Sequence, residues 1–216
     1  MNLKSYLKKA PYLCCLLVIP FLGLIYGLLN NRAHNPIDIT TTLDSNTPFI
    51  PIFIIPYILW YAYLFCYLGY FCFKDIKIYF KSLILIVAAQ LICFVIYFFF
   101  QTTVPRPTLE SNNFILKLVE WIYSLDRPYN CFPSIHVLTT FVVMLVSKHI
   151  KNKYVLNTIC IHLAGTLIIV STLFVKQHVI IDMIGSIVLV TLLNCLPLEL
   201  LLFKLLRNHR HLHEKS

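Results

Sequence analysis

The amino-acid sequence predicts an all-α fold: a polytopic membrane protein in which one integral-membrane domain, residues 1–216, forms a bundle of six transmembrane helices. Three observations lead to this prediction. Hydrophobic residues make up 59% of the chain and the mean hydropathy is +0.78, far above the usual composition of a soluble protein. The apolar residues form continuous runs of membrane-spanning length. The lysines and arginines between these runs are dense in one loop and sparse in the next.

Six apolar runs have the roughly 20 residues that a helix needs to cross a bilayer. The runs are continuous rather than alternating, which favours helices over the strands of a membrane barrel. The first run follows lysines, as in a signal peptide, but it is too long for one and "NNRAHNP" is a poor cleavage sequence. We therefore interpret it as a retained span. The predicted spans are residues 10–29, 51–73, 79–100, 133–149, 154–174 and 178–197.

The positive charges predict which side of the membrane each loop faces. Of the 18 Lys and Arg residues, thirteen lie in the terminal segments, in the loops after the second and fourth spans or at the span ends that border these loops. The positive-inside rule places these segments, and therefore both termini, in the cytoplasm. The net charge is +9, but the basic residues fall in short clusters between apolar runs and form no basic face for nucleic acid. The five residues on the opposite side are Arg32, Arg106, Lys117, Arg127 and Lys176.

The eight cysteines are expected to be free thiols. Seven lie within or at the ends of apolar runs, and only Cys131 lies near a long loop. Neither a CxxC motif nor a Cys/His metal spacing is present, so no metal and no cofactor is predicted. Gly23 and Gly27 form a small-xxx-small pattern. Close packing inside the bundle is preferred for this pattern, and a homodimer interface stays open as the alternative.

The outer loop, residues 101–132, is expected to hold one short helix at the membrane surface. Ser111 is its predicted cap and Trp121 its interfacial anchor. Simple packing over the bundle is preferred to a gating role. Apolar residues recur along one face of this helix at Phe114, Leu118, Ile122 and Leu125.

Polar residues gather where the third span ends and the fourth begins. "TTVPRP" places Arg106 after the third span, and "NCFPSIHV" places Ser134 and His136 at the start of the fourth. Pro133 suits the first turn of a helix, whose free amides, together with the Ser134 hydroxyl, suit an anionic oxygen. Arg106 offers a planar fork for two phosphate oxygens. His136 can donate or accept a proton.

A third polar stretch, "VKQHVIID", begins the sixth span on the same face, so its charges lie at the interface and not at the bilayer centre. His178 and Asp182 are four residues apart and on a helix share a face. A carboxylate on one imidazole nitrogen leaves the other with a lone pair, which suits a nucleophile or a base. Lys176 adds a point charge for phosphate. An isolated His/Asp pair is more often structural, but two further polar clusters on this face favour an extracytoplasmic active site.

These stretches resemble the signature motifs of the type 2 phosphatidic acid phosphatase superfamily, integral membrane enzymes that cleave or transfer phosphate esters of lipids. The order and span placement of "PRP", "PSIH" and "STLFVKQHVIID" resemble the family's six-span core over nearly the whole chain. The resemblance implies that His178 attacks phosphorus to form a phosphohistidine and that Asp182 orients it. It implies that His136 protonates the leaving alcohol and later activates the acceptor. It also implies that Arg106 and Ser134 hold the phosphate oxygens without a metal.

Two positions depart from the family's pattern. The Lys expected at the start of the first motif is Phe99, and the Ser-Arg of the third motif is Ser171-Thr172. We expect Lys176 to replace one of these phosphate cations. Arg127 is a weaker candidate for the other, because a solvated loop charge is an equal alternative. These variants resemble the inositol phosphorylceramide synthase-like branch of the superfamily, as does the stretch "DSNTPFIPIFIIPYILWY".

The predicted function is hydrolysis of a lipid phosphomonoester or pyrophosphate through a phosphohistidine. One alternative is a lipid phosphotransferase, similar to inositol phosphorylceramide or sphingomyelin synthases, that uses the same site. Another is a non-catalytic lipid-phosphate carrier or scaffold, which needs neither His178 nor Asp182. The expected partners are a lipid phosphate substrate and membrane lipids, and the expected location is the plasma membrane. Asp44, before the second span, is left without a chemical role.

Overall fold

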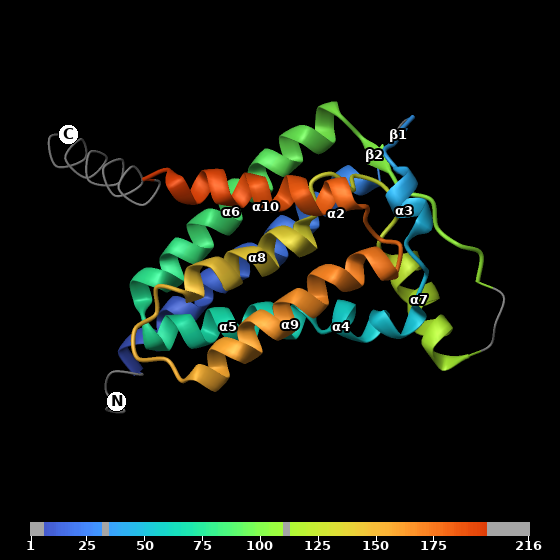
Figure 1. The fold of residues 1–216 in the computed structure, drawn as a ribbon. Helices are drawn as coiled ribbons and strands as arrows, with labels where there is room; N and C mark the ends of the chain where they lie inside the picture. Colours follow the sequence, from blue (N-terminus) through green and yellow to red (C-terminus); the bar gives the residue numbers. More distant parts are fainter. Residues whose placement is uncertain (1–6, 32–34, 110–112, 198–216) are drawn as a thin grey trace, which may run out of the picture.

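The structure of the chain is a computed structural model that describes residues 7–31, 35–109 and 113–197. Helices run alongside one another as a bundle, and short elements collect at one end of it (Figure 1). The bundle consists of η1 (Ala10–Leu17) with α2 (Val18–Asn30), η2 (Pro51–Phe53) with α4 (Ile54–Ile58) and α5 (Trp60–Lys74), α6 (Ile76–Phe99), α8 (Ile135–Ser147), α9 (Val155–Phe174) and α10 (Ile180–Cys195).

Helix length separates the predicted spans into two groups. The helices at the fourth and sixth positions are apolar but short, with 13 residues in α8 and 16 in α10. At about 1.5 Å per residue α8 covers roughly 20 Å, less than a hydrocarbon core of about 30 Å. Six membrane crossings therefore stay a prediction. The four stretches of the described chain that are long and apolar enough to cross are Leu7–Asn30, Pro51–Lys74, Ile76–Phe99 and Val155–Phe174.

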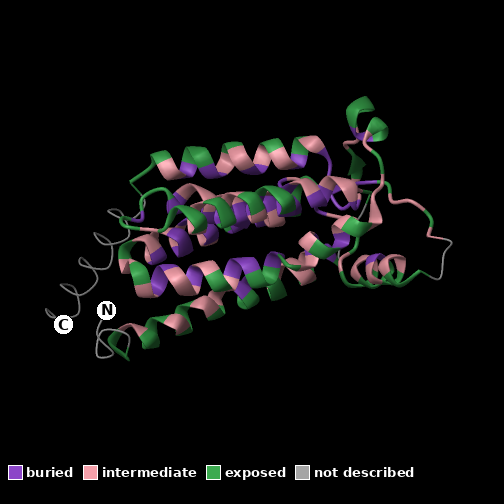
Figure 2. Cartoon of the chain, turned by 60° about the horizontal axis from the view of Figure 1, so that its bottom comes forward, coloured by how far each residue is buried: buried purple, intermediate pink, exposed green. Residues whose placement is uncertain are grey.

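α8 packs against α5, α6, α9 and α10. Leu138, Val142 and Val146 of α8 are completely buried in the main core. The indole N–H of Trp60 on α5 donates to Thr139 Oγ1 on α8 at 2.9 Å. Buried residues face the inside of the bundle, and exposed residues lie on the outside (Figure 2). The position of α8 is therefore fixed by packing against several neighbours.

Short elements cover the end of the bundle where α6 finishes and where α8 and α10 begin. They are β1 (Ile37–Asp38), α3 (Thr42–Asn46), β2 (Thr102–Thr103) and α7 (Phe114–Leu125). The parallel pair of β1 and β2 is a small addition to the predicted all-α fold.

α7 is the amphipathic helix predicted for the outer loop. Val119 is buried against the bundle, while Trp121 is 53% exposed. The side chain of Asn113 accepts the Ile115 N–H and caps the helix. The predicted cap was therefore wrong, and Ser111 itself lies outside the described residues.

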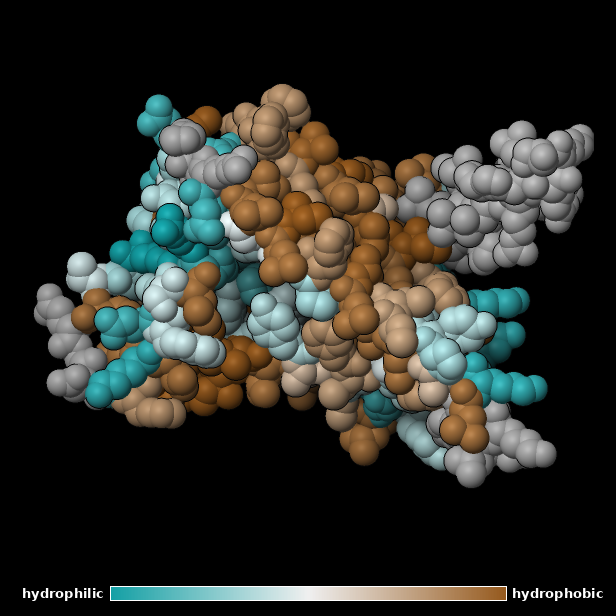
Figure 3. Space-filling view, turned by 180° about the vertical axis from the view of Figure 1, so that it is seen from behind, coloured by the Kyte–Doolittle hydropathy of each residue, from teal (hydrophilic) through white to brown (hydrophobic). Residues whose placement is uncertain are grey.

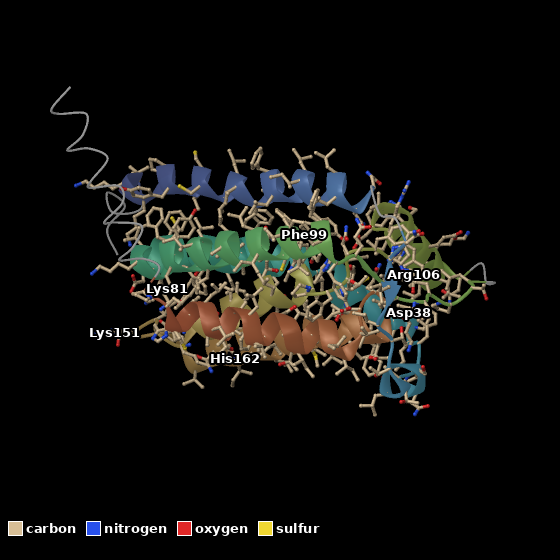
Figure 4. The ribbon with its side chains drawn as sticks, turned by 90° about the horizontal axis from the view of Figure 1, so that it is seen from above. Asp38, Lys81, Phe99, Arg106, Lys151 and His162 are labelled. Atoms are coloured by element: carbon tan, nitrogen blue, oxygen red, sulfur yellow. The ribbon has the colours of Figure 1, made fainter. Side chains whose placement is uncertain are left out.

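Charged and apolar residues divide the surface into zones. Figure 3 shows a broad hydrophobic middle with hydrophilic residues toward both ends. Lys81 and Lys151 lie at one end of the bundle, and Arg106 and Asp38 lie at the other (Figure 4). The two labelled lysines and the motif-bearing end therefore lie at opposite ends of the bundle. Which end faces the cytoplasm stays a prediction.

The glycine pair on α2 does not make the close helix contact expected for it. A Cβ added at Gly23 or Gly27 meets no atom within 4 Å. Both glycines instead line a large cavity. A close helix contact of the expected kind occurs at Gly165 on α9, where an added Cβ would lie 2.6 Å from Met144 Sδ on α8. Internal packing at Gly23 and Gly27 was therefore a wrong interpretation, and the homodimer alternative stays open.

Candidate active site

The turn between α9 and α10 carries the third motif. Lys176 has a φ of 52°, a left-handed conformation that is uncommon for a residue with a Cβ. The N–H groups of Gln177 and His178 both donate to the Thr172 carbonyl, at 3.0 and 3.1 Å. These bonds reverse the chain, and α10 begins only at Ile180. His178 therefore precedes the helix, and the predicted span start at residue 178 was early.

His178 and Asp182 form the predicted pair by a different route from the one expected. His178 Nδ1 lies 3.2 Å from Asp182 Oδ2, and the two side chains are 8% and 0% exposed. The same oxygen accepts the Val179 N–H at 2.9 Å, so Asp182 also caps the first turn of α10. The pair forms because Asp182 reaches back past the helix start, and not because both residues share a helical face. With Nδ1–H donating to the carboxylate, Nε2 keeps the lone pair.

His136 lies in the first turn of α8, beside His178. The centroids of the two imidazole rings are 5.8 Å apart. The His136 ring packs against the Tyr57 ring at 4.6 Å and the Trp60 ring at 4.3 Å. Because the Trp60 indole is itself held by Thr139, aromatic packing fixes the plane of His136. The structure thus brings together the two histidines that the motifs singled out.

Ser134 is the N-cap of α8 and lines neither of the cavities described below. Its Oγ accepts the Val137 N–H at 3.3 Å, and the residue is fully buried. Its carbonyl accepts the Ser186 hydroxyl at 2.9 Å, which ties α8 to α10. Pro133 precedes the cap and follows a cis peptide bond with Phe132, so its predicted place in the first turn was wrong. A phosphate contact from Ser134 stays a prediction.

Arg106 is held by acceptors from two other segments. Nη1 donates to the Tyr123 carbonyl at 3.2 Å, and Nη2 donates to the Asp126 carbonyl at 2.8 Å and to Gln177 Oε1. The guanidinium carbon lies 4.2 Å from the Tyr123 ring centroid, a cation–π contact. Nε has no partner among the described residues. The fold therefore holds the guanidinium beside the His178 turn, where Arg106 lines the first of the cavities described below.

Lys176 and Asp44 connect the first outer loop to this turn. Lys176 Nζ donates to the Asp44 carbonyl at 2.8 Å and to the Thr47 carbonyl. Asp44 Oδ1 accepts the N–H of Ile180, the first residue of α10, at 2.8 Å. Burial raises the pKa of Asp44, but hydrogen bonds from Thr41 and the Ile180 amide outweigh it and hold the pKa below its ordinary value. Asp44, to which the sequence assigned no role, positions the start of α10.

His178 lies between two cavities. The first has a volume of about 240 Å³ and is lined by Arg106 and Lys176, with Asp44, Thr47 and Val104 nearby; we call it the cationic cavity. The second has a volume of about 570 Å³ and also contains His136. We call it the aromatic cavity, because its rings are those of Tyr26, Tyr57, Trp60, Tyr61, Phe65 and Tyr97.

The aromatic cavity contains an acidic residue that sequence reasoning missed. Asp126 follows α7, and its Oδ1 accepts the Tyr26 hydroxyl at 2.8 Å and Asn30 Nδ2 at 3.1 Å. Burial raises the pKa of Asp126 above its ordinary value. Arg127 lines the same cavity with an exposed side chain, and its binding of phosphate stays a prediction. An acid at the end of the surface helix is visible in the sequence, but no local signal shows that it turns inward.

The two positions that lack the family's cations lie outside both cavities. Phe99 ends α6 with 79% of its surface exposed, apart from Arg106 (Figure 4). Thr172 is fully buried in α9. The basic residues that line the cavities come from other positions: Arg106 and Lys176 line the cationic cavity, and Arg127 lines the aromatic cavity.

One group of described residues has ligand types that Zn²⁺ accepts. Ligand atoms of Cys131, His178 and Asp182 lie within 4.8 Å of one another, and all three residues are buried. Sequence spacing did not predict this cluster, because its members come from separate segments. Burial raises the pKa of the Cys131 thiol well above its ordinary value. Zn²⁺ accepts thiolate, imidazole and carboxylate, but here it would compete with the His178–Asp182 contact.

A family model described as the PAP2 superfamily matches residues 78–198. The matched segment is 121 of the 216 residues, and it contains Arg106, His136, His178 and Asp182. Comparisons with curated proteins and with solved structures find no match. Because the matched segment exceeds half of the chain and contains both histidines of the site, this chain belongs to the PAP2 superfamily, whose chemistry is phosphatase-type phosphoryl transfer.

Proposed function

We propose that this chain is a membrane enzyme that hydrolyses a lipid phosphomonoester or pyrophosphate through a phosphohistidine intermediate. The observation that carries the proposal is the pair of His178 and Asp182 at 3.2 Å, with the His136 ring 5.8 Å from that of His178. A lipid is favoured because the aromatic cavity extends along α2, where Leu24 and Leu28 are exposed and apolar. A lipid tail can occupy such a surface while its phosphate reaches His178.

The residues perform the reaction in two steps. His178 Nε2 attacks phosphorus, and the P–N bond forms as the bond from phosphorus to the alcohol oxygen breaks. His136 gives its proton to the leaving oxygen, then takes one from water, whose oxygen attacks phosphorus as the P–N bond breaks. Inorganic phosphate leaves and His178 returns to its first state. Asp182 balances the positive charge on the His178 ring, and Arg106 and Lys176 stabilise the charge on the phosphoryl oxygens.

A phosphotransferase of the inositol phosphorylceramide or sphingomyelin synthase type is the second candidate. The volume of about 570 Å³ favours it, because the aromatic cavity has room for an acceptor alcohol in addition to water. His136 can activate an alcohol as it activates water. The test gives the purified protein a panel of lipid phosphates with and without acceptor alcohols. Free phosphate identifies a hydrolase, and a new phosphodiester lipid identifies a transferase.

Labelling with ³²P-lipid phosphate tests the nucleophile. The wild-type protein should take up an acid-labile, base-stable label, and His178→Asn should take up none while still binding the lipid phosphate through Arg106 and Lys176. His136→Asn should slow both formation and breakdown of the intermediate, and a p-nitrophenol leaving group should restore formation in part. A labelled or normally active His178→Asn protein would exclude His178 as the nucleophile. Binding without turnover by the wild type would favour the carrier.

The proposed location is the plasma membrane, with both termini cytoplasmic and the site extracytoplasmic. The lysine-bearing end and the site end of the bundle lie apart (Figure 4), and the positive-inside rule favours the cytoplasm for the lysine-bearing end. In a cysteine-free background, Asn46→Cys on α3 should react with an impermeant maleimide outside cells, and Lys151→Cys should be protected. The native thiol of Cys131 in the outer loop cannot report which side of the membrane it faces, because Cys131 is only 3% exposed. Labelling of residue 151 from outside would reverse the orientation.

A further inference from the structure

The aromatic cavity holds a carboxylate close to a site that must accept phosphate. Asp126 lines this cavity together with His136 and His178. A carboxylate repels phosphate oxygens, and Arg106 and Lys176 line the other cavity. An ionised carboxylate only accepts hydrogen bonds. Asp126 is therefore suited to a part of the substrate that carries an N–H or O–H group, and not to the phosphate.

The fold uses only part of the hydrogen-bonding capacity of Asp126. Its two side-chain hydrogen bonds in the described ranges, from Tyr26 and Asn30, both go to Oδ1. Its main-chain carbonyl accepts a hydrogen bond from the Arg106 guanidinium. Within these same ranges Oδ2 has no partner, although the residue lines an open cavity. His178 lines the same cavity, so the carboxylate faces the space that contains the reacting centre.

The position of His136 shows which part of the substrate lies in this cavity. In the proposed reaction His136 protonates the alcohol oxygen as the ester bond breaks, so the alcohol lies on the His136 side of His178. His136 and Asp126 line the same cavity. One alcohol molecule can then meet His136 with its ester oxygen and Asp126 with a neighbouring donor group.

We propose that Asp126 is a specificity-determining residue that selects an alcohol carrying a hydrogen-bond donor near its phosphate ester. The inference rests on the proposed function and adds the class of alcohol. An ammonium group and a hydroxyl group share the required chemistry. The rings of Tyr26, Tyr61 and Phe65 also suit an ammonium group through cation–π contacts. Substrates whose alcohol has neither group gain nothing from Asp126.

A panel of three phosphomonoesters tests the inference by turnover. Sphingosine 1-phosphate carries an ammonium and a hydroxyl group, lysophosphatidic acid carries a hydroxyl group, and phosphatidic acid carries neither. Asp126→Asn should lower kcat/KM for the first two on the order of tenfold or more, the usual effect of losing a hydrogen bond to a charged group. The value for phosphatidic acid should change little. A lower kcat/KM for lysophosphatidic acid alone identifies the donor as the hydroxyl group. A lower kcat/KM for sphingosine 1-phosphate alone identifies it as the ammonium group.

Binding of soluble alcohols tests the same inference without turnover. Trp60 lines the aromatic cavity, and the only other tryptophan of the chain is Trp121. In a Trp121→Phe protein, Trp60 fluorescence should respond to ethanolamine or glycerol, and Asp126→Asn should weaken this response on the order of tenfold. This measurement separates the two proposals. If the protein turns over no lipid phosphate but its fluorescence response still depends on Asp126, the inference about donor groups stands and the proposed hydrolase function is contradicted.

Two matched variants separate specificity from stability. Glu120→Gln removes an exposed acid of α7 and should leave all three substrates unchanged. Tyr26→Phe removes one bond to Oδ1 but keeps the carboxylate, so it should preserve the order of substrate preference. Equal loss for all three substrates in Asp126→Asn would show a merely structural role and overturn the inference. An unchanged preference, or no Trp60 response to either alcohol, would also overturn it.

Discussion

The cationic and aromatic cavities meet at His178 but are built in different ways. The cationic cavity is small, about 240 Å³, and its Arg106 and Lys176 come from loops tied down by backbone carbonyls. The aromatic cavity is about 570 Å³, and its walls are mostly side chains of helices α2, α5, α6, α7 and α8. The first suits the phosphate, which every substrate shares, and the second suits the alcohol, which differs between substrates. Variants in the first should affect all substrates equally, and variants in the second should change selectivity.

The largest effect should come from Asp182, the hydrogen-bond partner of His178, which lies between the two cavities. Asp182→Asn should lower kcat by about 10⁴-fold, as loss of an orienting carboxylate does in a comparable triad. The amide keeps the helix cap, so the protein should stay folded by circular dichroism. Steady-state kinetics with two unrelated lipid phosphates should show the same factor. A loss confined to one lipid would contradict a role in orienting His178.

The next effect concerns the cationic cavity. Arg106→Ala should lower kcat/KM by about 10²- to 10³-fold, because it removes a positioned cation from the transition state. Arg106→Lys, which restores charge without the fork, should recover only part of the loss. The loss should be equal for phosphatidic acid and sphingosine 1-phosphate. Unequal losses would break the proposed division between the cavities.

A smaller effect should follow from the cap that Asp44 provides. Asp44→Ala removes the acceptor of the Ile180 N–H and should cost about 1 kcal/mol, a typical value for a lost cap. The melting temperature should fall, and kcat should fall as the His178 turn loosens. Asp44→Asn keeps an acceptor and should recover most of both. If Asn is as damaging as Ala, the negative charge matters more than the cap.

A selective effect should come from filling the aromatic cavity. Gly23→Leu adds a side chain where no atom lies within 4 Å of a Cβ. It should raise KM severalfold for long-chain lipid phosphates and leave p-nitrophenyl phosphate turnover unchanged. Gly69→Leu, on α5 and also in open space, is the matched control because Gly69 does not line the cavity. Equal effects of the two variants would argue against a lipid in the aromatic cavity.

No effect is expected from removing metal ions. Excess EDTA should leave turnover unchanged, because fixed cations and not a metal act on the phosphoryl group in the proposed reaction. Added Zn²⁺ should inhibit by binding Cys131, His178 and Asp182, and Cys131→Ser should weaken this inhibition. Loss of activity in EDTA with recovery on adding a divalent metal would contradict the proposed mechanism.

The sequence alone determined the helical class, the approximate helix positions and the histidine pair. Apolar runs are local, so the length of the stretch Ile76–Phe99 is visible without its neighbours. The motifs are local too, and their order along the chain was enough to place His136 and His178 at one end of the bundle. The start of α10 could not be predicted, because the turn before it depends on hydrogen bonds from Gln177 and His178 to the Thr172 carbonyl.

Only the tertiary structure decided how the site is divided and which other residues belong to it. Asp44 accepts a hydrogen bond from Ile180, which lies 136 residues away in the sequence, and Tyr26 donates one to Asp126, which lies 100 residues away. Cys131 likewise lies near His178 only because the folded chain brings their separate segments together. A side chain with no local pattern gives no sign of its distant partner, because contact between remote segments depends on how all the helices pack. Hydrophobic length and motif spacing are local properties, whereas the shape and charge of a cavity are properties of the whole bundle.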